Sequence, residues 1–180
     1  MLNYEKIRKE IIKRYINAGV ERSEAIYEVD RIIEYALGIQ YKELIMNPNK
    51  VIDVHKISKL DSYINQRLKD KRPLQYIVKE AYFNGFPFFV DERVMIPRRD
   101  TEILVEVVAK ICKSSGLCFV CEIGTGSGCV GISVLKQCPH LKIFAIDLSE
   151  DALDVAEINL RKHQVENRMA IFRTDILRSV

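Results

Sequence analysis

The segment Glu122–Cys129 places an acid and three glycines at alternate positions, which is a pattern suited to binding a ligand. Gly124, Gly126 and Gly128 lack a Cβ and tolerate positive φ, so a ligand can lie against the backbone and the N-terminus of a following helix. The apolar residues 118–121 before the loop do not alternate with polar ones, which is typical of a strand buried on both faces of a parallel sheet. We therefore predict a buried strand, a cofactor loop and a helix in this order.

Two further acids stand where later strands are expected to end. The apolar residues 141–146 predict a second strand ending in Asp147, and residues 169–173 predict a third strand ending at Asp175. An acid at the end of the second strand can accept hydrogen bonds from both ribose hydroxyls of an adenosyl group, and an acid after the third could meet the adenine amino group. The alternative is that the glycines form only a turn and Asp147 only caps a helix. The order of strand, loop, helix, strand and acid favours the cofactor site.

The spacing of the glycines also bears on the identity of the cofactor. A nicotinamide fingerprint needs Gly at the sixth place of G-x-G-x-x-G, where this chain has Cys129. With E-x-G-x-G-x-G in front of a strand that ends in an acid, the segment resembles motifs I and II of the class I S-adenosylmethionine-dependent methyltransferases. S-adenosylmethionine carries no phosphate, and the loop has no phosphate-binding Lys. We therefore expect S-adenosylmethionine as the cofactor.

Composition and charge exclude several other classes. Of the 180 residues, 48% are hydrophobic and 29% are charged, as in soluble globular proteins, and the net charge of +3 is too small to argue for nucleic acid. No apolar run approaches the roughly 20 residues of a membrane span, and the N-terminus lacks the apolar core of a signal peptide, so we expect a cytoplasmic protein. Cys118 and Cys121 match C-x-x-C, but odd spacing sends strand side chains to opposite faces. We interpret both as small apolar fillers of a buried strand rather than a metal or redox site.

Patterns along the chain divide it into three parts and predict the α/β fold class. Residues 1–72 carry apolar stripes at helical spacing, which predict an N-terminal helical bundle. Residues 73–97 predict a β-hairpin linker, because a proline ends the preceding helix and an Asn-Gly pair lies between β-prone runs. Residues 98–180 predict the N-terminal half of a Rossmann-like methyltransferase domain with three parallel strands.

Helix caps and apolar faces give more local predictions. Ser23 is predicted to cap the second helix of the bundle, and Asp53 or Ser58 a later one. Asp100 or Thr101 is predicted to cap a helix with a single apolar side. That side consists of Ile103, Leu104, Val107, Val108 and Ile111. The aromatic residues of the hairpin suit either a pocket lid or packing on the core, and both interpretations stay open.

Four motifs in a fixed order narrow the resemblance. They are Arg72-Pro73-Leu74-Gln75-Tyr76-Ile77, Phe83-Asn84-Gly85, Ile96-Pro97-Arg98 with Asp100-Thr101-Glu102, and Gly124-Thr125-Gly126-Ser127-Gly128-Cys129. Together they resemble the HemK/PrmC family of release factor glutamine methyltransferases, over the whole chain. The family usually has Gly at the position of Lys79 and Pro at the position of Arg99, and both departures concern local backbone shape.

This resemblance implies methyl transfer from S-adenosylmethionine to the side-chain amide nitrogen of the Gln in the Gly-Gly-Gln motif of peptide chain release factors. It implies substrate recognition as the role of the helical bundle of residues 1–72. It also implies a set of cofactor contacts. These are the loop Gly124, Thr125, Gly126, Ser127 and Gly128 against the methionine portion and ribose, Glu122 near the methionine amino group, Asp147 at the ribose hydroxyls, and Asp175 with Ile176 at the adenine. The family's Asn-Pro-Pro-Tyr motif, which orients the amide, follows a fourth strand that this chain lacks. No catalytic residue and no metal ligand is therefore predicted here.

We accordingly expect a fragment of a longer enzyme, inactive alone, which acts as a monomer on release factors without a membrane or direct nucleic-acid binding. Two alternatives remain. One is a methyltransferase for amino groups of nucleic acids, since Asn-Pro-Pro motifs also serve adenine. The other is a non-catalytic remnant that binds a partner through its helical bundle. A nicotinamide oxidoreductase is disfavoured by Cys129.

Overall fold

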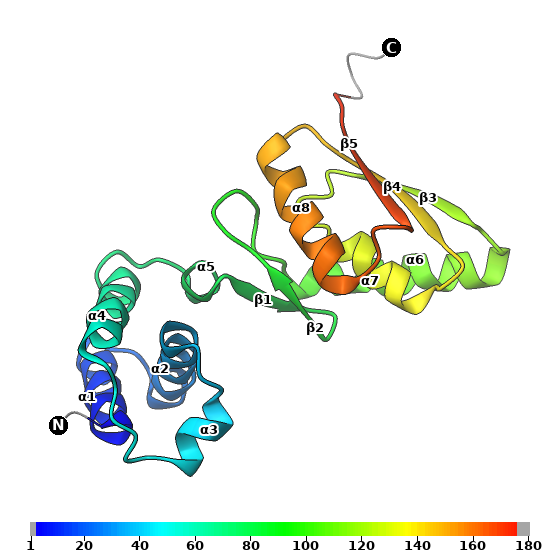
Figure 1. Cartoon of the computed structure of the whole chain (residues 1–180). Helices are drawn as coiled ribbons and strands as arrows, with labels where there is room; N and C mark the ends of the chain where they lie inside the picture. The colour runs from blue at the N-terminus through cyan, green and yellow to red at the C-terminus, as the bar shows by residue number, and fades with distance from the viewer. Residues whose placement is uncertain (1–2, 176–180) are drawn as a thin grey trace. The chain divides into compact units, whose positions relative to one another are not determined.

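The structure divides the chain into two compact units that meet between Val78 and Lys79. It is a computed structural model that describes residues 3–175 (Figure 1). The first unit is helical, and the second contains a hairpin and a parallel sheet. The short helix α5 (Leu74–Val78) belongs to the first unit and the hairpin to the second. The domain boundary at residue 72 and the separate linker of residues 73–97 remain predictions.

Four helices precede α5 in the first unit: α1 (Tyr4–Asn17), α2 (Arg22–Leu37), α3 (Tyr41–Met46) and α4 (Val54–Leu68). The apolar stripe of α1 is buried with the inner faces of α2 and α4, which confirms the predicted bundle. Asp53 caps α4, as predicted, by accepting a hydrogen bond from the His55 amide. The cap of α2 is Glu21 rather than Ser23, because the Glu21 carboxylate accepts from the amides of the first helical turn.

An ion pair with a buried carboxylate joins two helices of the bundle. The guanidinium group of Arg67 on α4 donates from Nε and Nη2 to both carboxylate oxygens of Glu28 on α2, at 2.8 and 2.7 Å. Glu28 is buried, whereas the pair between Arg14 and Asp61 joins side chains that are 39% and 52% exposed. A buried carboxylate depends strongly on its partner, and an exposed one does not.

The second unit begins with an antiparallel hairpin of β1 (Glu80–Phe83) and β2 (Phe86–Phe89). The predicted Asn84-Gly85 turn is confirmed, with φ of 50° and 81° at its two central residues, as a type I′ turn requires. Phe83 and Phe88 are fully buried in the core of this unit. Phe83, Phe86 and Phe88 therefore pack on the core rather than form a lid, whereas Tyr82 is exposed.

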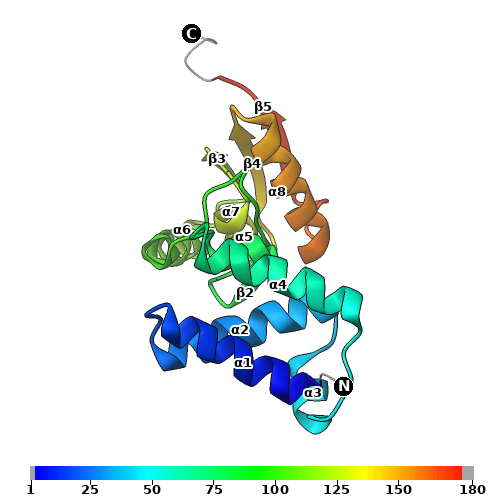
Figure 2. The same ribbon diagram turned by 90° about the vertical axis from the view of Figure 1, so that its left-hand side faces the viewer.

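Three parallel strands, β3 (Phe119–Ile123), β4 (Lys142–Asp147) and β5 (Met169–Arg173), form the sheet in the order β3-β4-β5. Helices α7 (Cys129–Gln137) and α8 (Glu150–His163) connect them, and the short helix η1 (Arg99–Thr101) leads into α6 (Glu102–Ser115). Side chains of α6, α7 and α8 share one core with the inner face of the sheet. Figure 2 shows α8 alongside β4 and β5. The predicted α/β half-domain with three parallel strands is confirmed.

The outer face of the sheet is exposed, which corrects the prediction of a strand buried on both faces. Phe119, Phe144 and Phe172 form a stacked row across the strands, with ring centroids 6.1 and 6.3 Å apart. Cys118 and Cys121 are also exposed, so they are not fillers of a buried strand. The sequence is apolar on both faces of β3, but the described helices pack against only one of them.

The predicted apolar side of α6 is likewise wrong in part. The residues that α6 buries in the core are Val105, Ala109 and Cys112. Of the predicted side, only Val108 packs against this core, and the others are exposed. Because α6 is apolar around most of its circumference, periodicity alone did not indicate which side meets the sheet.

Candidate cofactor site

The loop between β3 and α7 runs from Gly124 to Gly128 and has its three glycines at positive φ. Gly124 has a φ of 73° and Gly126 one of 55°, where other residues are strained. A Cβ built on either residue would meet no atom within 4 Å, so this side of the loop is open. The Gly124 amide donates to the Ile146 carbonyl oxygen at 2.8 Å, which fixes the loop to the end of β4. A ligand can thus approach a backbone that is already ordered.

Asp147 ends β4 and holds the loop through its side chain. Its Oδ2 accepts from the Gly126 amide at 2.9 Å, and its Oδ1 accepts from the Ser149 amide at 3.0 Å. A carboxylate offers about four lone-pair sites, so each oxygen retains one for a further donor. A ribose diol supplies two such donors, and the predicted role of Asp147 therefore fits its geometry.

A cavity of about 390 Å³ lies at the carboxyl ends of the three strands. Ligands of open α/β sheets bind at this edge. The structure brings together here three of the predicted residues, Gly124, Asp147 and Asp175. Leu148 and Thr174 also line the cavity; they directly follow β4 and β5, and that position was the available signal. Ile176 lies outside the described residues. The cavity fits the adenosyl half of the expected cofactor.

Glu122 points beneath the loop rather than into that cavity. Its carboxylate accepts hydrogen bonds from the Thr125 hydroxyl at 2.9 Å and from the Gly131 amide at 3.3 Å. Loss of hydration, helped by the negative charge of Asp147, raises the pKa of Glu122 to about 7, although the two hydrogen bonds act to lower it. Glu122 therefore supports the loop directly, and its contact with a methionine amino group stays a prediction.

Gly131 permits the close packing of α7 on the sheet. A Cβ at this position would lie 2.4 Å from Glu122 Oε2 and 2.9 Å from Met169 Cε. Both distances are too short for any side chain. The sequence pattern did not single out Gly131, although it follows the loop by one helical turn.

A second cavity, of about 340 Å³, lies between α6, β3 and α7. Glu122 and Thr101 are its polar lining residues, and it shares Ile123 and Gly124 with the first cavity. The two cavities are therefore neighbours at the start of the loop. Thr101 was predicted only as a helix cap, and it makes no such side-chain hydrogen bond.

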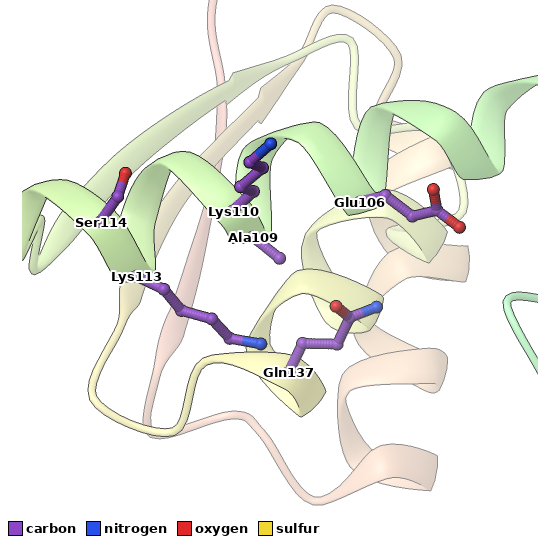
Figure 3. Close-up of a pocket in the computed structure, with 6 residues that line it drawn as sticks. All are labelled: Glu106, Ala109, Lys110, Lys113, Ser114 and Gln137. Atoms are coloured by element: carbon purple, nitrogen blue, oxygen red, sulfur yellow. The ribbon is translucent and has the colours of Figure 1, made fainter.

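A third hollow, shown in Figure 3, lies between α6 and the far end of α7. Its volume is about 510 Å³. The close-up shows Lys113 extending toward Gln137, which is the last residue of α7, while the loop is at the first. None of the predicted cofactor residues lines it. The hollow is therefore not part of the cofactor site.

Each of the two units matches the model of a known domain family. The PrmC N-terminal domain matches residues 7–78, and the methyltransferase small domain matches residues 99–180. The chain belongs to the HemK/PrmC family. The release factor glutamine methyltransferase of Chlorobaculum tepidum is 34% identical over 93% of this chain and 59% of its own length. That of Clostridium acetobutylicum is 34% identical over 96% and 60%. A bifunctional methyltransferase of Rickettsia bellii is 30% identical over 91% and 35%.

The chain thus spans about three fifths of the length of the first two relatives. Its two departures from the family pattern have local structural explanations. Lys79 has a φ of 56°, a conformation that the family's usual Gly adopts without strain. Arg99 is the first residue of η1, where the fixed φ of Pro is also suitable.

Proposed function

We propose that this chain forms the cofactor-binding part of an enzyme that methylates the glutamine side-chain amide in the Gly-Gly-Gln motif of release factors. The observation that carries the proposal is the meeting of Gly124, Asp147 and Asp175 in one cavity at the carboxyl ends of parallel strands. The names of the family relatives support the choice of release factors as substrates. The helical unit would recognise the release factor, and the enzyme would act as a monomer in the cytoplasm without binding nucleic acid.

The chemistry divides between cofactor and protein. When bound, S-adenosylmethionine supplies an electrophilic methyl group, and the products are a methylated amide, S-adenosylhomocysteine and a proton. An amide nitrogen is a weak nucleophile because its lone pair is delocalised, so the enzyme must orient that lone pair toward the methyl group. Within residues 3–175 we assign no group to this task, and we propose that the Asn-Pro-Pro-Tyr segment of the family supplies it.

The exposed outer face of the sheet supports a position for that missing part. Phe119, Phe144 and Phe172 are 59%, 46% and 52% exposed, and β3 has a free edge within the described residues. Apolar rows and open edges of this kind favour pairing with further polypeptide. We propose that the remaining two fifths of the enzyme pack against this face and extend the sheet from β3.

Binding of S-adenosylhomocysteine, measured by calorimetry on the full chain, tests the cofactor site. Asp147→Asn preserves the size of the side chain but removes its charge and one of its two acceptor oxygens. We expect affinity to fall about tenfold or more, as for loss of a hydrogen bond to a charged group. Asp154→Asn, on the exposed side of α8, should leave affinity unchanged. Equal affinities of wild type and Asp147→Asn, or tight binding of NAD, would contradict the proposed site.

A second experiment tests the substrate. The chain would be joined to the C-terminal segment of the Clostridium acetobutylicum relative and supplied with tritiated S-adenosylmethionine. We expect label in a release factor, no label when the Gln of Gly-Gly-Gln is replaced by Ala, and none in RNA. Label in RNA instead would favour the nucleic-acid methyltransferase, and no transfer to either would favour the non-catalytic remnant.

A further inference from the structure

Asn159 on α8 joins two segments that are distant in the sequence. Its side chain is fully buried, and its amide makes three hydrogen bonds. Nδ2 donates to the carbonyl oxygens of Ser127 in the loop and Phe89 in β2, both at 2.9 Å, while Oδ1 accepts from the Phe89 amide at 2.7 Å. Only one orientation of the Asn159 amide satisfies all three bonds. The side chain is thus a fixed bridge between the glycine loop and the hairpin.

The peptide between Ser127 and Gly128 is held at both ends. Its carbonyl oxygen accepts from Asn159, and its N–H donates to the Thr125 carbonyl oxygen at 2.9 Å. Gly128 has a φ of 76° and leads directly into α7. Rotation of this peptide would break both hydrogen bonds and leave buried polar groups unpaired, which is unfavourable. The conformation at the start of α7 therefore depends on Asn159.

The opposite side of the loop is held by Asp147, which accepts from the Gly126 amide. Asp147 ends β4, and α8 begins three residues later with Asn159 in its third turn. The single segment from β4 to α8 therefore carries two of the side chains that hold the loop. Asn159 differs from Asp147 in that its other partner is the hairpin.

The hairpin also has an anchor separate from the loop. The His163 ring on α8 lies 3.1 Å from the Pro87 carbonyl oxygen through Nε2, and its centroid is 4.6 Å from that of Phe88. Lys162 pairs with Glu80 at 3.1 Å. A change at His163 therefore perturbs the hairpin without removing a hydrogen bond to the loop, which makes it a matched control.

We infer that Asn159 is a positioning residue that couples the β1–β2 hairpin to the glycine loop and holds the loop in its ligand-accepting conformation. The coupling between hairpin and loop is inferred from the set of hydrogen bonds made by Asn159. Only the statement that this loop conformation accepts a ligand rests on the proposed function. Asn159 is not among the residues that line the two cavities of the cofactor site, and its effect acts through the Ser127–Gly128 peptide.

Amide hydrogen exchange followed by mass spectrometry tests the coupling on the unliganded full chain. Asn159→Leu keeps the number and branching of the side-chain heavy atoms and removes all three hydrogen bonds. We expect exchange to rise about tenfold or more in peptides covering both 124–131 and 86–90, the factor that corresponds to about 1.4 kcal/mol. His163→Gln should raise exchange in 86–90 only. Unchanged exchange of 124–131 in Asn159→Leu, or an equal rise there in His163→Gln, would overturn the inference.

If Asn159→Leu does not fold, Asn159→Ser, which is smaller and retains one donor, replaces it with the same expectations at lower amplitude.

The affinity for S-adenosylhomocysteine is a second measurement of the effect of Asn159. Asn159→Leu should weaken binding about tenfold, and His163→Gln should leave it within about twofold. If wild type binds no S-adenosylhomocysteine, the proposed function fails, whereas the exchange result still decides whether Asn159 couples the two segments.

Discussion

Replacement of Glu122 by Gln should change the pH dependence of stability in a defined direction. The carboxyl group has a pKa of about 7 in the folded chain, against its usual 4.5. Between these values the folded state binds more protons than the unfolded state, so stability falls as pH rises from 4.5 to 7. At about 1.4 kcal/mol per pKa unit, the total loss at high pH is about 3 kcal/mol, and most of it arises between pH 5 and pH 8.

The variant Glu122→Gln does not titrate at this position, and its amide can keep both hydrogen bonds. Its carbonyl oxygen can accept from the Gly131 amide, while its amino group can donate to the Thr125 hydroxyl oxygen. We therefore expect the variant to gain about 2–3 kcal/mol relative to wild type when pH is raised from 5 to 8. The gain reflects removal of a charge that the folded state hydrates poorly.

Urea-dependent amide exchange in peptides from β3 and α7 measures this gain for the second unit alone. Wild type and variant are compared at the same pH, so the intrinsic exchange rates cancel. Glu106→Gln, an exposed replacement on α6, serves as the control and should give no pH-dependent difference. A difference between wild type and Glu122→Gln that is equal at pH 5 and pH 8 would refute the reasoning.

Three further predictions concern stability. Gly131→Ala should destabilise the second unit by about 1–3 kcal/mol through overpacking, seen as a lower urea midpoint for exchange in α7. Arg67→Met should cost about 3–5 kcal/mol in thermal unfolding of the helical unit because it leaves a buried carboxylate unpaired, whereas Arg14→Met, in an exposed pair, should cost less than about 1 kcal/mol. Lys79→Gly should raise stability by about 0.5–1 kcal/mol in calorimetry by relieving a positive φ, and no change or a loss would show that the strain is absent.

Sequence patterns indicated the edge of the sheet where the first cavity lies, because the candidate cofactor-binding acids stand at the ends of predicted strands. Asp147 and Asp175 each follow an apolar run, and in a parallel sheet the ends of such runs lie at one edge. The hairpin turn was predicted for a similar reason, since Asn-Gly has few other conformational uses. Both predictions depend only on residues that are close together in the sequence, and for this reason they could be made without the structure.

What sequence patterns did not reveal depends on contacts between distant segments. Asn159 bonds to residues 70 and 32 positions away, and its only signal is a polar residue on the buried stripe of α8. The orientation of the Glu122 side chain beneath the loop depends on the hydrogen bond that it accepts from the Gly131 amide. The exposed faces of α6 and β3 were misassigned because each element is apolar on more than one side, and pattern alone does not show which side is covered.

The division of the chain between Val78 and Lys79 has a consequence for synthesis on the ribosome. The helical unit is one uninterrupted stretch, and its last residue is made before any strand of the sheet. The sheet pairs Phe119 with Lys142 and Ile143 with Met169, so each strand pair must wait for an intervening helix. Such nonlocal pairing is slow. We expect the bundle to fold first on the nascent chain, while the apolar strands stay open longest and are the part that chaperones protect.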